Sequence, residues 1–265
     1  GYIKTKNQSN MARIIVNADD FGLDVGTNNA IQLGFEGGLI SSTTLLANLS
    51  GFDDAIERIR QGKIPENAVG IHLNLTQGKP LTNGIINEPR FCRDGNFHGE
   101  IRRKPVLNLS SSEKMNLRLE VSAQIKKVHE AGIKPTHIDG HHHIHTEWAI
   151  FQSSKKTILN SRISKMRLSR TAGIHYSGIN GLLKKLYKFQ FNRWLRISGF
   201  STTNRMGEFT DFFEAPLENE IVEIMTHFVR DASGNYNLDG IAKDEYRLLS
   251  KAFNEKNNLI TFHSI

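Results

Sequence analysis

Short runs of apolar, often β-branched residues alternate along the chain with longer segments of helical periodicity. The apolar runs predict strands at residues 13–17, 42–47, 69–75, 137–145, 165–168, 200–203, 221–226 and 259–262. The segments of helical periodicity predict helices at residues 27–36, 53–60, 111–131, 147–159, 180–196 and 242–254. Strands that alternate with helices are typical of a mainly parallel sheet with crossover helices. About eight such strands predict an α/β fold, an irregular TIM-like (β/α) barrel, with an open doubly wound sheet as the alternative.

The length of 265 residues fits one large α/β domain or two small ones, and the chain shows no internal repeat. We therefore predict a single domain over residues 11–265. The first ten residues are polar and precede Met11, and we expect them to be a disordered leader or an expression remnant. Residues 76–110 are rich in Gly, Pro and Asn and predict a long loop, which in a compact domain is usually functional and often a lid.

The composition suits a soluble globular protein, with 38% hydrophobic and 23% charged residues. Lys and Arg exceed Asp and Glu by 34 − 27 = 7, but much of this excess is local and no nucleic-acid-binding module is recognisable. We expect no nucleic-acid partner. The basic segment 180–196 predicts an outer barrel helix with its apolar face on the sheet and its lysines in water. A helix lying on a membrane surface is the alternative interpretation.

The chain contains no apolar run of the ~20 residues that a membrane span requires and no recognisable secretory signal. Its single cysteine, Cys92, excludes an internal disulfide and a thiolate metal cluster. We expect an exposed thiol at this position and a cytoplasmic location.

Five of the eleven histidines lie within nine residues, in the segment PTHIDGHHHIH at residues 135–145. Neutral imidazole is the commonest protein ligand for divalent metals. In a strand, one face would carry four polar side chains: Asp139, His141, His143 and His145. That face could supply a metal ligand and the groups that orient it. The alternative is a solvated polar loop that binds metal only by accident.

Polar side chains also occupy the ends of three other predicted strands. The first ends in Asp19-Asp20, the third carries His72 between apolar neighbours, and the strand at 221–226 runs into His227. Alone, each has an ordinary explanation, a solvated turn for the two aspartates and a packed core histidine for His72. Because active-site residues of barrels lie at the carboxyl ends of strands, their coincidence indicates a carboxylate and imidazoles around a divalent metal.

Three segments resemble the YdjC-like carbohydrate deacetylases, a family that includes the chito-oligosaccharide deacetylases: NADDFGL at 17–23, GIHLNLTQGKPL at 70–81 and PTHIDGHHHIH at 135–145. The resemblance runs in order from about residue 13 to 262. It implies a barrel-like fold, one divalent metal ion (Mg²⁺ or Zn²⁺), and metal-dependent hydrolysis of N-acetyl groups on amino sugars. The chain departs from the family at Phe228, where relatives usually have Pro.

The resemblance also implies residue roles. It implies three metal ligands: Asp20, His72 and His141. Asp19 would be the general base and His227 the general acid. The residues that orient the ligand rings would be Asp139, His143 and His145, with His137 as a further candidate.

Two other functions stay open. The substrate could be a membrane glycolipid amino sugar rather than a chito-oligosaccharide, or the chain could be another metal-dependent barrel hydrolase of the amidohydrolase or phosphoesterase type. A phosphoesterase would be expected to gather two metal ions and more carboxylate ligands. The expected partner is an N-acetylated sugar, and a homodimer is the commonest assembly for such a chain.

Overall fold

A computed structural model describes residues 12–102, 105–173, 178–212, 217, 219–230, 236–238, 241–242 and 258–265. The expected leader at 1–10 lies outside these residues. So does nearly all of the helix expected at 242–254, of which the structure describes only Ala242, as the end of a short strand.

The strands are, in chain order, β1 (Arg13–Phe21), β2 (Ser42–Leu45), β3 (Val69–Leu73), β4 (Cys92–Arg93), β5 (Asn96–Phe97), β6 (Ile138–Gly140), β7 (Arg205–Gly207), β8 (Ile221–Thr226), β9 (Phe228–Arg230), β10 (Tyr236–Leu238), β11 (Ile241–Ala242) and β12 (Asn258–Leu259). The helices are α1 (Val25–Glu36), α2 (Phe52–Arg60), α3 (Asn83–Ile86), α4 (Ser111–Glu130), α5 (Trp148–Asn160) and α6 (Gly178–Ile197).

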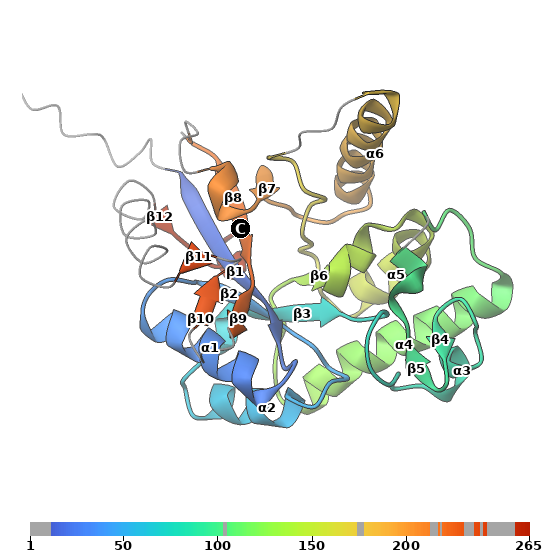
Figure 1. Cartoon of the computed structure of the whole chain (residues 1–265), viewed down its shortest axis with the longest axis horizontal. Helices are drawn as coiled ribbons and strands as arrows, with labels where there is room; N and C mark the ends of the chain where they lie inside the picture. The colour runs from blue at the N-terminus through green and yellow to red at the C-terminus, as the bar shows by residue number, and fades with distance from the viewer. Residues whose placement is uncertain are drawn as a thin grey trace, which may run out of the picture.

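The main sheet is parallel and curled, with the strand order β6-β3-β2-β1-β8-β7 and with β12 paired to the start of β1 (Figure 1). Two parallel bridges continue it, from Ile138 in β6 to Met166 and from Lys165 to Ser201, whose segment leads into β7. The hydrogen-bonded path therefore returns to β8 and β1. The predicted irregular (β/α) barrel is confirmed, and the open doubly wound sheet is not observed among the described residues.

The barrel is irregular where strands were expected at 165–168 and 200–203. The first segment pairs only through isolated bridges, and the strand near the second begins later, at Arg205. Just before β7, the Asn204 side chain accepts a hydrogen bond from the Ile221 backbone N–H at the start of β8. The last strand is likewise shorter than expected, since β12 ends at Leu259 and a 3₁₀ turn covers Phe262–Ser264.

The region expected to be a long loop, residues 76–110, is largely packed. It holds α3 and the antiparallel hairpin of β4 and β5, and the described part buries apolar side chains, among them Ile85, Phe91 and Phe97. Cys92 is only 5% exposed, so the expectation of an exposed thiol is wrong. Burial raises the pKa of its thiol to about 11, which keeps it protonated and unreactive at neutral pH.

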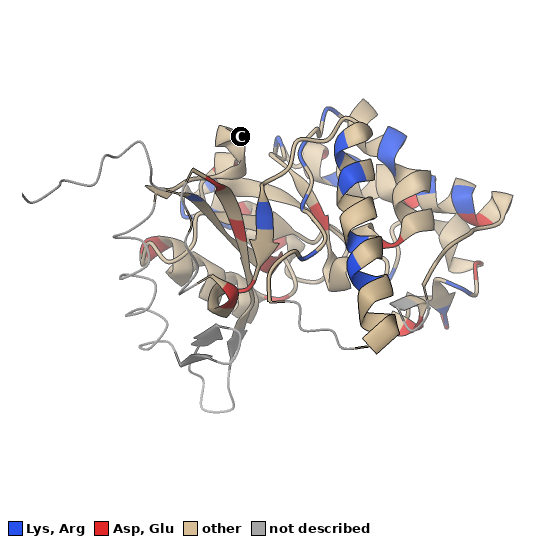
Figure 2. Cartoon of the chain, turned by 90° about the horizontal axis from the view of Figure 1, so that it is seen from above, with Lys and Arg blue, Asp and Glu red and all other residues tan. Residues whose placement is uncertain are grey.

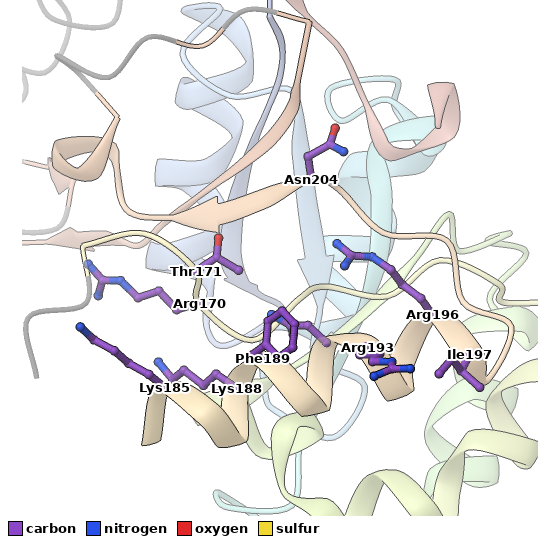
Figure 3. A pocket seen from close by; sticks show the side chains of 10 residues that line it. Arg170, Thr171, Lys185, Lys188, Phe189, Arg193, Arg196, Ile197 and Asn204 are labelled. Atoms are coloured by element: carbon purple, nitrogen blue, oxygen red, sulfur yellow. The ribbon is translucent and has the colours of Figure 1, made fainter. Parts of the chain in front are cut away.

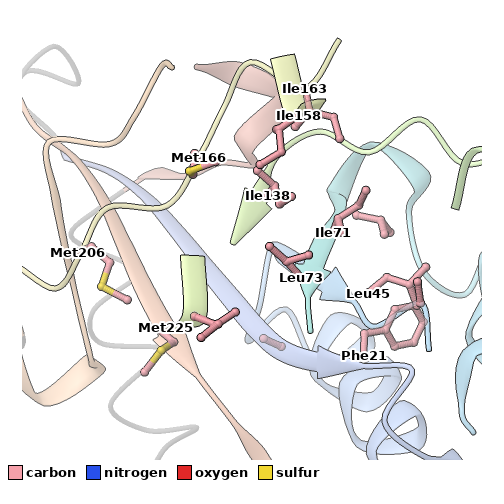
Figure 4. Packing of buried hydrophobic residues seen from close by; sticks show 14 of the residues in the cluster. Phe21, Leu45, Ile71, Leu73, Ile138, Ile158, Ile163, Met166, Met206 and Met225 are labelled. Carbon is pink, nitrogen blue, oxygen red and sulfur yellow. The ribbon is translucent and has the colours of Figure 1, made fainter. Parts of the chain in front are cut away.

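The main apolar core lies between the sheet and the helices around it. Strand β1 is buried along nearly its whole length, as a strand covered on both faces must be. Phe21, Leu45, Ile71 and Ile138 pack together from four neighbouring strands (Figure 4). Among the outer helices, α4 begins with a capping box in which Ser110 and Glu113 exchange hydrogen bonds.

Helix α6 differs from the expected outer helix. Its side chains Ile179, Leu182 and Phe189 are between 66% and 79% exposed, so the expectation that its apolar face covers the sheet is wrong. The residues that the structure describes include no helix with the length and hydropathy of a membrane span.

Candidate active site

Strand β1 carries two adjacent carboxylates, Asp19 and Asp20, whose side chains lie in different surroundings. Asp20 has a left-handed backbone with φ of 68°, and the pairing of β1 with β2 is irregular between Ala18 and Phe21. This irregularity departs from the simple alternation of a strand. Asp19 is 2% exposed inside the barrel, whereas the Asp20 side chain is 17% exposed and borders a cavity.

His72 comes from β3 and is buried between its apolar neighbours. Its Nδ1 lies 2.6 Å from Oδ1 of Asp139 in the adjacent strand β6, and Thr44 contacts the same nitrogen at 3.1 Å. Because Asp139 can only accept a hydrogen bond, the proton belongs on Nδ1. The Nε2 lone pair then faces Asp20, whose Oδ1 lies 3.2 Å away.

His141 follows β6, but not as part of a strand. The chain leaves the extended conformation after Gly140 and forms a 3₁₀ turn over His141–Thr146, with positive φ at His142 and His143. The predicted strand to residue 145, with its shared polar face, is therefore wrong. The turn places His141 Nε2 3.0 Å from Gln77 Oε1, to which this nitrogen can donate a hydrogen bond. The other ring nitrogen, Nδ1, then lies 2.7 Å from Asp20 Oδ1.

Asp20, His72 and His141 form a group that could hold a metal ion. One donor atom from each lies within 4.8 Å of the other two. Asp20 Oδ1 is buried and has no partner in hydrogen-bond geometry, although both rings approach it closely. When both rings are neutral, each gives its one proton to an acceptor on the far side, so that three lone pairs converge on one point. Two imidazoles and a carboxylate in this arrangement suit a divalent cation.

A buried arginine organises the carboxylates behind this group. Arg167 is fully buried and binds both oxygens of Asp19 at 2.6 and 2.7 Å. The same guanidinium contacts Asp139 at 2.8 Å and Glu223 of β8 at 2.5 Å. One guanidinium thus faces three carboxylates, and Asp20 lies nearby as a fourth.

The pKa values of Asp19, His72 and Glu223 reflect the excess of carboxylates over cations in this cluster. Burial alone would raise the pKa of Asp19, but the charge and hydrogen bonds of Arg167 hold it well below its ordinary value. Burial would lower the pKa of His72, yet the carboxylates around it, Asp139 foremost, raise it to about 10. Burial raises the pKa of Glu223 to about 7 against the effect of Arg167. A cluster of this kind favours a cation at its open side.

A second set of potential ligands, Asp19, His72 and Asp139, lies beside the first. Arg167 already places its guanidinium nitrogens within 2.8 Å of both carboxylates of that set. Because the guanidinium is positively charged and contacts these ligand atoms directly, it would repel a metal ion bound to them. In the described part of the chain, the geometry therefore favours one metal position rather than two.

His227 follows β8 and lies at the edge of the same site. Its Nε2 is 3.9 Å from Asp19 Oδ2, and its side chain is 38% exposed. Together with Asp20, Asp24 and Phe228 it borders a cavity of about 450 Å³. Phe228, where the family usually has Pro, lies so close to Gly34 that an added Cβ there would come within 2.7 Å of its ring.

The other predicted histidines are placed differently. His143 and His145 pack edge to face, with ring centroids 6.4 Å apart, and a role for them in orienting the ligands stays a prediction. His137 stacks on Phe262 at 3.7 Å and fills the space beside Gly70. Burial lowers the pKa values of His137 and His145 well below the ordinary value, so both rings are neutral.

No role was predicted from the sequence for four residues that hold the site: Thr44, Gln77, Arg167 and Glu223. The only local signal is the presence of Arg167 and Glu223 inside apolar strand segments, because a charged residue there requires a buried partner. Nothing local marks Gln77 as a neighbour of His141.

A family model described as YdjC-like protein matches residues 13–258. The chain belongs to the YdjC-like family. Thus the resemblance predicted from three short segments is confirmed over nearly the whole chain.

Curated relatives of this YdjC-like chain are named as deacetylases. It is 31% identical to a carbohydrate deacetylase of Brevibacillus brevis over 220 residues, which cover 81% of this chain and 80% of that protein. It is 35% identical to a chitooligosaccharide deacetylase of Escherichia fergusonii over 179 residues, or 66% and 67% of the two chains. The match to a carbohydrate deacetylase of Clostridium beijerinckii, at 35% identity, covers 53% of this chain and spans only 54% of that relative.

The fold has a solved counterpart. The crystal structure of an Enterococcus faecalis V583 protein superposes with a TM-score of 0.70 over 96% of this YdjC-like chain and 98% of that one. The two sequences are 22% identical, so this likeness supports the barrel fold alone.

Proposed function

We propose that this YdjC-like chain is a metal-dependent hydrolase that removes N-acetyl groups from amino sugars. The observation that carries the proposal is the convergence of Asp20, His72 and His141 beside an arginine-held Asp19 and a partly exposed His227. The names of the relatives support an N-acetylated carbohydrate, such as a chito-oligosaccharide, as the substrate.

Asp20, His72 and His141 would hold the metal ion. When bound, a divalent ion lowers the pKa of water and polarises the acetyl carbonyl, which an unactivated amide requires. The donor set admits both Zn²⁺, which imidazole favours, and Mg²⁺, which the carboxylate favours. In the neutral rings, the contacts with Asp139 and Gln77 favour a proton on the outer nitrogens, which leaves the inner nitrogens available as ligands.

The proton transfers fall to two residues on the chain. Arg167 keeps Asp19 ionised, so this carboxylate can take a proton from the attacking water. His227 would then protonate the leaving nitrogen of the sugar, which would otherwise depart as an unstable anion. Its partial exposure at the cavity edge allows this ring to exchange protons with solvent.

The phosphoesterase alternative receives no support from the described residues. A two-metal site needs a second group of ligands, and the neighbouring group has Arg167 between its carboxylates. The glycolipid alternative shares the chemistry proposed here and differs only in the rest of the substrate.

Metal content and acetate release from diacetylchitobiose, measured together on wild type and His141→Ala, test the proposal. We expect about one divalent ion per chain and acetate release in wild type, and loss of both in the variant, because the remaining two ligands hold a metal weakly. His129→Ala, an exposed histidine on α4, should change neither. Wild-type protein that binds none of several divalent ions would contradict the metal site. Bound metal without acetate release would contradict the substrate class.

A second expected result concerns His227. Replacing it with Gln should leave metal content unchanged and lower kcat on N-acetyl sugars by about 10² to 10⁴. An acetate ester of a good leaving group, such as 4-nitrophenyl acetate, needs no protonation, so its hydrolysis should fall far less. Equal losses on the amide and the ester, measured by steady-state kinetics, would rule out His227 as the acid.

A further inference from the structure

Helix α6 is attached to the rest of the chain mainly by side chains of its C-terminal half, among them Phe191, Asn192 and Arg196. Phe191 packs edge to face on Phe151 of α5, with centroids 5.2 Å apart. Asn192 accepts a hydrogen bond from the Ser169 backbone N–H and donates one to its carbonyl. Because Ser169 follows Arg167 by two residues, α6 is fixed to the segment that carries this buried arginine.

The opposite side of α6 is apolar and uncovered. Along the helix, a stripe of side chains between 53% and 79% exposed recurs mostly at intervals of three and four residues: Ile179, Leu182, Leu183, Leu186, Phe189 and Ile197. This spacing places most of them on one helical face. A barrel helix normally turns such a face to the sheet, and contiguous exposed apolar surface marks an interaction site.

The charge of α6 has a single sign. The helix carries five cations and no Asp or Glu: Lys184, Lys185, Lys188, Arg193 and Arg196. Viewed from above, α6 shows only blue bands (Figure 2). Several of these cations and Phe189 line a groove of about 870 Å³ between α6 and the segment after Arg167 (Figure 3). Arg170, across the groove, is neutralised by Glu208 and Asp211.

The partner of this surface must offer anionic groups next to an apolar phase. A second copy of the chain meeting it by the same face would bring like charges together. A small soluble anion would leave the leucines in water. An anionic lipid bilayer satisfies both requirements, because headgroups meet Lys and Arg while apolar side chains enter the acyl boundary.

We propose that α6 is a docking surface for an anionic lipid bilayer, on which the helix lies flat with its Leu-rich stripe inserted and its cations at the headgroups. The proposal stands on the exposure and charge of α6 and does not depend on the deacetylase chemistry.

Co-sedimentation of the full chain with vesicles tests the proposal. Wild type should bind phosphatidylcholine vesicles that contain phosphatidylglycerol, bind pure phosphatidylcholine vesicles much more weakly, and lose affinity as salt rises. Lys185→Gln with Arg193→Gln should lower the partition coefficient about fivefold for each cation removed. Leu182→Gln with Leu186→Gln should lower it about tenfold or more, because the stripe can no longer insert.

Matched controls come from α4, which has exposed residues of the same types. Leu119 is 54% exposed and the Lys126 side chain 72% exposed, and Leu119→Gln or Lys126→Gln should bind vesicles like wild type. All variants should keep wild-type activity on a soluble substrate. Absence of wild-type binding to anionic vesicles, or undiminished binding by the α6 variants, would overturn the proposal. A dimer in light scattering that Leu182→Gln with Leu186→Gln dissociates would also overturn it, since a second copy would then cover this face.

Discussion

Replacing Asp19 with Asn is expected to leave the metal ion bound and to abolish turnover. The amide keeps the shape of the side chain but cannot take a proton from water. Positioned general bases contribute about 10² to 10⁴ in rate, so kcat should fall by at least that range while KM changes little. Asp20 and the two histidines are untouched, so metal content, measured on the same samples as acetate release, should stay at the wild-type level.

The control for this substitution is Asp54→Asn. Asp54 is also an aspartate with a lowered pKa and an arginine partner, Arg58 at 2.7 Å, but it lies on α2 away from the site. It should keep full activity. If Asp19→Asn retains near wild-type activity, the assignment of the base is wrong. If the variant loses its metal as well, the assignment of Asp20 as a metal ligand and Asp19 as the base alone is wrong.

The strands that carry the site could be predicted well from local pattern. The strand expected at 221–226 is β8 residue for residue, and the apolar runs around Ile15 and Ile71 lie in β1 and β3. A strand that is buried on both faces in a barrel requires a continuous run of apolar residues. The polar residues on either side of such a run mark where the strand begins and ends. Because strand ends meet at one face of a barrel, the approximate gathering of Asp19, Asp20, His72 and His227 followed from sequence as well.

The histidine segment shows where local pattern fails. Alternating polar residues suggested a strand through His145, but the chain turns at His141 and adopts positive φ at two histidines. That turn is held in part from far along the chain, by Gln77 on His141 and Thr76 on His142. Contacts more than 60 residues apart leave no mark on the local sequence. The same limit applies to α6, whose periodicity predicts a helix but not which of its faces meets the barrel.

Replacing Arg167 with Met is expected to destabilise the protein more than any other single change in the site. The side chain is fully buried, and its one guanidinium contacts all three of Asp19, Asp139 and Glu223. Removing one partner of a buried ion cluster typically costs about 3–5 kcal/mol, because the remaining charges stay buried without compensation. We expect a loss of that size in the free energy of unfolding, measured by denaturant titration at pH 7.

The pH dependence separates a charge effect from a packing effect. In wild type the pKa of Asp19 is lower in the folded protein than in the unfolded chain. The ion pair of Asp19 with Arg167 therefore stabilises the fold fully above about pH 4, and this contribution is lost as the pH falls further. In the Met variant the buried carboxylates can relieve their repulsion by taking up protons. The difference in stability between wild type and variant should therefore be larger at pH 7 than near pH 4. A difference that does not change with pH would mean that lost packing, not charge, is the cause.

A second substitution tests whether the three carboxylates act as one cluster with Arg167. Glu223→Gln placed in the Arg167→Met background removes one of the uncompensated charges, so it should recover part of the lost stability, whereas the same change in wild type should be neutral or destabilising. Arg167→Lys keeps the charge but not the planar fork that reaches three carboxylates, and should fall between wild type and Met in stability. Strict additivity of Arg167→Met and Glu223→Gln would contradict the cluster. A further outcome is a double variant that recovers stability without recovering turnover. That result would show that Arg167 positions Asp19, because Glu223→Gln cannot restore the two hydrogen bonds that hold the base in place.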